Sequence, residues 1–258
     1  MKNYELEAKN EQLLLPSSHH FGHKILKLLG ENHESNRAVI EFGTASFNKG
    51  ILIDDPRRQN EDAIYCDPES AVFGIFDGED NVNNTMKASE IAATVARESV
   101  EDAAPEDTDD MAEMVESIND AVYYDQTAGH STGTIGRVII KNGKKFLLYA
   151  SIGDSRIYLV RDGDARQITT DENEKNANPN MLGKSMVSIR QIGEIPLKQN
   201  DWVVFCSNGV TDNFDHDFVS SKEFATTITH SSSASHAANA LIKKSTVPDD
   251  RTAIVVKV

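Results

Sequence analysis

The sequence is poor in cysteine: Cys66 and Cys206 are the only two among its 258 residues. Two cysteines cannot build the disulfide framework that staples small secreted domains. A chain of this length can bury a substantial hydrophobic core without such staples. We therefore expect a protein of a reducing compartment, the cytoplasm, whose fold depends on hydrophobic burial.

Long apolar runs are also missing. No stretch approaches the roughly 18 consecutive apolar residues that suggest a transmembrane helix. The first five residues, Met-Lys-Asn-Tyr-Glu, are polar and lack the apolar core of a signal peptide. We therefore expect no membrane-spanning helix and no export signal.

Basic residues are outnumbered by acidic ones. Lysine and arginine total 26 against 41 aspartates and glutamates, which gives a formal net charge of −15 at pH 7. Such a charge disfavours binding to the phosphates of nucleic acids and to anionic membranes. We therefore predict neither as a partner. Cation binding and simple solubility are both compatible with this charge, and the sequence defines no oligomeric state.

The most informative stretch is residues 71–78, Ala-Val-Phe-Gly-Ile-Phe-Asp-Gly. Its apolar run contains β-branched and aromatic residues, and is long enough for one buried strand but too short for a helix. Asp77 and Gly78 end this strand. A carboxylate there needs a cation or several hydrogen-bond donors, although a lone Asp-Gly pair is more often a tight turn.

Acidic residues flank a predicted hairpin in this region. We expect strands at residues 63–66 and 71–76, joined by a turn at residues 67–70. Antiparallel pairing then brings Asp62 close to Asp77. Carboxylates gathered in this way repel one another unless a divalent cation lies between them, and hard oxygen ligands suit magnesium or manganese. Solvated surface charges are the alternative interpretation.

The rest of the chain groups strands and helices in blocks. Helices are expected at residues 85–101, after a cap at Thr108 or Asp109, at 221–228 and at 235–244. Further strands are expected at residues 38–42, 49–53, 132–140, 145–152, 157–160, 165–168, 188–192, 202–206 and 253–256, those from 132 to 168 forming one meander. This order lacks the alternation of a parallel βαβ sheet, and so indicates an α+β fold in which helices cover antiparallel sheets.

The second of these helices has an apolar stripe at helical spacing. Its members are Met111, Met114, Val115, Ile118 and Val122. Residues 1–35 are polar, and we expect them to be a partly disordered extension with one short helix at residues 23–29.

Acidic or amide residues recur at other expected strand ends. These motifs are Gly153-Asp154-Ser155-Arg156, Ser207-Asn208-Gly209-Val210-Thr211-Asp212 and Asp249-Asp250-Arg251-Thr252. Together with Arg-Arg-Gln-Asn-Glu-Asp at residues 57–62, Asp77-Gly78 and Ser-Thr-Gly-Thr at residues 131–134, they resemble the motifs of the type 2C (PPM) metal-dependent protein phosphatases. Each motif alone is weak, but six occur in family order across residues 37–258.

The resemblance implies a four-layer α/β/β/α sandwich, in which a pair of helices lies on each outer face of two antiparallel sheets. The phosphatase domain would cover residues 36–258, after an N-terminal extension at residues 1–35. The family likeness also implies a bacterial, cytoplasmic signalling enzyme whose substrate is a phosphorylated protein.

The resemblance further implies that two manganese or magnesium ions, with a weaker third, activate the water that attacks phosphoserine or phosphothreonine. The implied ligands are Glu61, Asp62, Asp77, the Gly78 carbonyl, Asp154, Asn208, Asp212 and Asp249. Asp77 would bridge two ions and so act in catalysis, while Asp154 and Asp212 would serve the third. Arg57 would be the other catalytic residue, because its guanidinium suits the substrate phosphate.

Several positions depart from the family pattern, including residues 80–82, where a glycine-rich continuation is usual, and Asp171-Glu172, where Asp-His is usual. Asn208 places a neutral amide where an aspartate is usual, and Glu79 follows Gly78 where many members have a histidine. One hypothesis is therefore a serine/threonine phosphatase with reduced activity. A pseudophosphatase scaffold, which binds a phosphoprotein or another partner without cleaving it, is the second. A structural or metal-binding sandwich with no phosphate ligand is the third.

Overall fold

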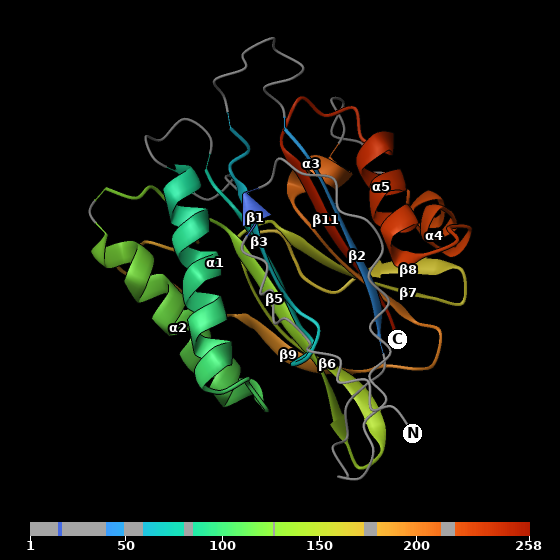
Figure 1. Ribbon diagram of the computed structural model, residues 1–258, viewed down its shortest axis with the longest axis horizontal. Coiled ribbons are helices and arrows are strands. Elements are labelled where there is room, and N and C mark those ends of the chain that lie inside the picture. The colour runs from blue at the N-terminus through green and yellow to red at the C-terminus, as the bar shows by residue number, and fades with distance from the viewer. Residues whose placement is uncertain are drawn as a thin grey trace, which may run out of the picture.

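The computed structural model describes residues 15–16, 40–48, 59–79, 85–125, 127–172, 180–212 and 220–258. These residues form two antiparallel sheets with helices on both outer sides. Figure 1 shows α1 (Thr85–Asp102) and α2 (Thr108–Tyr124) on one side, and α4 (Ser221–Thr229) and α5 (Ala234–Lys244) on the other. The predicted α+β sandwich is therefore confirmed.

The first sheet has the strand order β1-β3-β4-β5-β6-β9 and the second the order β2-β11-β10-β7-β8. The strands of the first sheet are β1 (Leu15–Pro16), β3 (Asp62–Asp67), β4 (Val72–Asp77), β5 (Gly133–Lys141), β6 (Lys144–Ile152) and β9 (Gln191–Pro196). Those of the second are β2 (Glu41–Phe47), β7 (Arg156–Arg161), β8 (Asp164–Gln167), β10 (Trp202–Cys206) and β11 (Arg251–Lys257). Because β2 pairs with β11, segments from opposite ends of the chain lie side by side.

Three layers of apolar side chains separate the four layers of the sandwich. One lies between the first sheet and α1–α2, one between the second sheet and α4–α5, and one between the sheets. In β4, Val72 and Phe76 belong to the first of these layers. Phe73 and Ile75 belong to the layer between the sheets. Because both faces of such strands are buried, their sequences are continuous apolar runs.

The start of α2 differs slightly from the prediction. Asp107 is the N-cap residue, because its carboxylate accepts hydrogen bonds from the backbone N–H groups of Asp109 and Asp110 at 2.9 and 3.1 Å. The prediction of Thr108 or Asp109 as the cap was therefore wrong. Residues 107–109 all have side chains that can cap a helix, so the sequence alone could not select among them. The predicted apolar stripe is confirmed, with Met111, Met114, Val115, Ile118 and Val122 all buried.

Two strand predictions were wrong in their bounds. The strand expected at residues 38–42 is β2, which continues to Phe47 because it pairs with β11 along its length. The strand expected at 188–192 is β9, whose pairing with β6 starts at Gln191. The expected strand at 49–53 and helix at 23–29 lie outside the described residues.

The meander predicted for residues 132–168 was wrong, because β6 and β7 belong to different sheets. β6 ends at Ile152 in the first sheet, and β7 begins at Arg156 in the second. Between them Gly153 has a φ of +92°, a conformation that favours glycine. The bend that carries Asp154 is therefore a crossing between the sheets.

None of the helices in the described ranges combines the length and apolar character that crossing a bilayer requires.

The close contact between β2 and α5 generates a test of the packing. A Cβ atom on Gly43 would overlap backbone atoms of Ala234 and Ser235. Gly43→Ala should therefore lower the free energy of unfolding by about 1–3 kcal/mol or more, measured by urea denaturation. Gly193→Ala is the matched control, since the atoms nearest to its Cβ would belong to the Tyr149 side chain, the first of them 3.2 Å away. Equal losses in the two variants would contradict the close packing.

Candidate metal centre

The pairing of β3 with β4 places Asp62 directly opposite Asp77, as the sequence predicts. Just beyond the strands, the backbone N–H of Gly78 donates to the carbonyl of Glu61 at 3.2 Å. Four of the sequence-predicted site residues therefore lie together at one end of the sandwich.

The carboxylates at this end raise one another's pKa. Burial raises the pKa of Asp62 to about 7, and the charge of Asp250 adds to this effect. Burial also raises the pKa of Asp77, which is only partly exposed. The charges of three other aspartates add to that rise: Asp62, Asp249 and Asp154. The site thus holds more negative charge than its surroundings stabilise.

The start of β11 brings a second acidic pair to the same place. Asp250 is 3% exposed, and its carboxylate accepts the backbone N–H of Glu61 at 2.9 Å. The carboxylate of Asp249 accepts the backbone N–H of Asp250 at 2.8 Å. A Cβ on Gly209 would overlap the carbonyl oxygen of Asp250. The turn that carries Asn208, at the start of the short helix α3 (Asn208–Thr211), therefore packs against this pair.

Two buried oxygens at this end have no hydrogen-bond partner among the described residues, Asp62 Oδ1 and Asn208 Oδ1. The other oxygen of Asp62 accepts from Ser207 Oγ at 2.9 Å. A buried acceptor without a partner costs free energy. Oxygen acceptors beside carboxylates are the ligands that magnesium and manganese take, so the residues present fit such a cation.

Acidic side chains alone do not complete a metal site here. No three histidine, cysteine, aspartate or glutamate side chains in the described part of the chain are arranged to hold one ion. A cation at this end would therefore need the Asn208 oxygen, backbone carbonyls such as that of Gly78, or water as further ligands.

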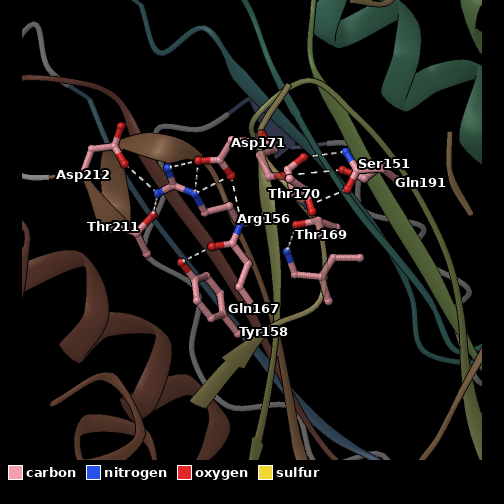
Figure 2. Close-up of polar contacts among 12 residues, drawn as sticks. Ser151, Arg156, Tyr158, Gln167, Thr169, Thr170, Asp171, Gln191, Thr211 and Asp212 are labelled. Atoms are coloured by element: carbon pink, nitrogen blue, oxygen red, sulfur yellow. Dashed lines mark hydrogen bonds and ion pairs between the residues drawn. The ribbon is translucent and has the colours of Figure 1, made fainter. Parts of the chain in front are cut away.

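The bend after β6 leads into a buried arginine whose role the sequence analysis did not identify. Figure 2 shows the guanidinium of Arg156 between Asp171 and Asp212. Arg156 Nε lies 2.9 and 3.1 Å from the two Asp171 oxygens, and Nη1 donates to Asp212 at 2.6 Å. Nη1 also donates to Thr211 Oγ1. A charged arginine side chain at 2% exposure needs such partners. In the sequence, the only indication of this cluster was an arginine next to an acidic turn.

The two residues predicted for a third ion differ in their surroundings. The carboxylate of Asp212 is about 40% exposed and is paired with Arg156. Burial raises the pKa of Asp154 to about 6, although the charge of Arg156 opposes this rise. An ion bound by both residues would therefore compete with the guanidinium. Arg57, the predicted phosphate ligand, lies outside the described residues.

Solved structures with this fold include bacterial serine/threonine phosphatases. One from S. agalactiae has a TM-score of 0.67 at 21% identity, and the match covers 85% of this chain and 99% of that one. PstP/Ppp of Mycobacterium tuberculosis has a TM-score of 0.65 at 19% identity, covering 85% and 98%. The PstP catalytic domain in complex with two manganese ions has a TM-score of 0.63 at 20% identity, covering 84% and 97%. The fold is thus that of the PPM phosphatases, which confirms the resemblance seen in the motifs.

A sequence comparison defines the family more closely. The family model of Stage II sporulation protein E (SpoIIE) matches residues 86–258, from the first turn of α1 onward. The chain therefore belongs to the SpoIIE family. The match begins after the strand pair that carries Asp62 and Asp77, so it is independent of that part of the site. A search of curated protein sequences found no match.

The raised pKa of Asp62 predicts how pH affects the metal-free protein. Its folded-state pKa of about 7 exceeds the ordinary 3.8, so the folded state binds a proton that the unfolded state releases. This contribution to stability is complete below pH 3.8 and is lost as pH rises through about 7. We expect a loss of roughly 2–4 kcal/mol over this range in a chelator, measured by urea denaturation.

The control for this effect is Asp62→Asn, which cannot titrate. Its metal-free stability should fall less over the same pH range than that of the wild type. In the wild type, manganese should reverse the loss of stability at pH 7, because a cation that binds only the folded state stabilises that state. Identical pH dependence in the two proteins would contradict the assignment.

Proposed function

We propose that the protein is a metal-dependent phosphatase that hydrolyses phosphoserine or phosphothreonine in other proteins. The observation that carries this proposal is the pairing of Asp62 with Asp77 beside Asp249, with unpartnered oxygens on Asp62 and Asn208. The fold shared with serine/threonine phosphatases supports it.

The proposed ligand set would hold two ions, manganese or magnesium. Asp77 would bridge them, with Asp249 and Asn208 on the first ion and Glu61 and the Gly78 carbonyl on the second, partly through water. Asp62 would complete the acidic cluster, opposite Asp77. Bound ions of this kind lower the pKa of a water and so supply a nucleophile at neutral pH. The two manganese ions in the related PstP structure support this number.

Arg57, Asp154 and Asp212 complete the proposed assignments. Arg57 would bind the substrate phosphate through its guanidinium. Asp154 and Asp212 would bind a third ion only weakly, because Arg156 already holds Asp212 at 2.6 Å. The positively charged guanidinium of Arg156 thus occupies the place of a third metal beside Asp212.

The proposal extends to organisation and setting. Residues 36–258 would form the catalytic domain, with residues 1–35 as an extension whose β1 pairs with β3 at the edge of the first sheet. Because Cys66 and Cys206 are both free, we place the protein in the reducing cytoplasm, where it would act in bacterial signalling.

One alternative is a pseudophosphatase that binds phosphoproteins without cleaving them. Asn208 favours it, because a neutral amide holds a divalent ion less strongly than a carboxylate does. The unpartnered Oδ1 of Asn208 favours the active enzyme instead, because that oxygen can still ligate an ion. The two functions differ in turnover.

Turnover with manganese tests the choice. The wild type should hydrolyse p-nitrophenyl phosphate and a phosphoserine peptide, and Asn208→Asp should lower the half-saturating manganese concentration about tenfold. Asp77→Asn should lose at least about 100-fold in kcat because the bridging carboxylate is gone. Manganese binding by calorimetry, without turnover in either the wild type or Asn208→Asp, would favour the pseudophosphatase.

Substrate affinity tests the role of Arg57. Arg57→Ala should raise KM for the phosphoserine peptide roughly tenfold, because a charged hydrogen bond to the phosphate is removed. Arg58→Ala is the matched control, since it removes an equal charge from the next position. An unchanged KM and unchanged inhibition by inorganic phosphate in Arg57→Ala would refute this role.

A further inference from the structure

A glutamate–histidine pair adjoins the candidate metal centre. Glu79 directly follows Gly78, and its Oε2 lies 3.1 Å from Nδ1 of His130. The two backbones are also joined, because the N–H of Glu79 donates to the carbonyl of His130 at 3.1 Å. The next residue, Ser131, forms a β-bridge with Gly78. The Glu79 side chain therefore holds the imidazole of His130, and the backbone hydrogen bond holds the residue itself next to the strand end that carries Asp77.

The pair is accessible to a ligand. The side chains of His130 and Glu79 are 34% and 31% exposed. When Nδ1–H donates to the Glu79 carboxylate, Nε2 is the ring nitrogen left for other partners, and no described residue hydrogen-bonds to it. A carboxylate at Nδ1 also orients the ring, as in the serine hydrolases.

The other described histidines lie elsewhere. His230 is the C-cap residue of α4, and His236 lies in the first turn of α5. Both helices cover the outer face of the second sheet, whereas His130 is hydrogen-bonded to the segment that follows β4. In the described part of the chain, His130 is therefore the histidine placed beside the candidate metal centre.

We propose that His130, positioned by Glu79, donates a proton to the leaving group in the hydrolysis proposed above, on which this inference rests. Water attacks phosphorus, and the bond between phosphorus and the ester oxygen breaks with its electron pair on that oxygen. The ester oxygen takes the proton from His130 Nε2, while the attacking water loses a proton to solvent. The products are the free alcohol and inorganic phosphate, and the imidazole regains its proton from solvent.

The dependence of the rate on the leaving group tests this role. Serine alkoxide and phenolate leave poorly without a proton, whereas p-nitrophenolate is far more stable. In His130→Ala, kcat for phenyl phosphate should fall about 10- to 100-fold more than kcat for p-nitrophenyl phosphate. His130→Gln, which keeps a polar side chain, should similarly lower the ratio of kcat for phenyl phosphate to kcat for p-nitrophenyl phosphate. Glu79→Gln should lower it by a smaller factor, because it changes only the positioning group.

His230→Ala is the matched control and should keep the wild-type ratio. If His130→Ala and His130→Gln lost activity equally on both substrates, the ratio of the two kcat values would be unchanged. That result would indicate a structural role and overturn the inference, as would full activity on both substrates. A wild-type protein inactive on both substrates would refute the proposed function itself. The two failures are therefore distinguishable.

Discussion

The pairing of β3 with β4 is the constraint on which the candidate site depends. It sets Asp62 opposite Asp77, and both carboxylates have a raised pKa because burial and neighbouring negative charges disfavour ionisation. The hydrophobic layers on both faces of β4 fix this register, since a shift by one residue would turn Phe73 and Ile75 away from the core between the sheets. Apolar packing therefore holds two acidic groups together that would otherwise repel each other, and a divalent cation would relieve that repulsion.

The second sheet completes the site because its strand ends meet those of the first. Ser207, just after β10, donates through its hydroxyl to Asp62 at 2.9 Å, and its backbone N–H donates to the carbonyl of Thr252 at 3.0 Å. This serine thus links a carboxylate of one sheet to a strand of the other. The acidic groups are held by rigid strand ends from both sheets, an arrangement that favours a preorganised ion site.

Local patterns predicted those parts of the structure that local physics determines. The apolar runs of β4 and β10, the stripe of α2 and the pairing of Asp62 with Asp77 follow from burial and from a short turn. The end of β2 and the start of β9 depend on partners distant in the chain, so their bounds were not predictable. The same applies to the contacts of Arg156 with Asp212 and of Glu79 with His130, which are 56 and 51 positions apart in the sequence.

Asn208 is less of a departure in the structure than it is in the sequence. The amide removes one negative charge from the site, but Asp250 adds a carboxylate nearby that is 3% exposed. Its charge contributes to the raised pKa of Asp62, so it acts on the same group of oxygens. Because the affinity of a cation depends on the summed charge around it as well as on direct ligands, Asp250 offsets part of what Asn208 removes. The local charge is therefore compatible with cation binding at this end of the sandwich, even with an amide at position 208.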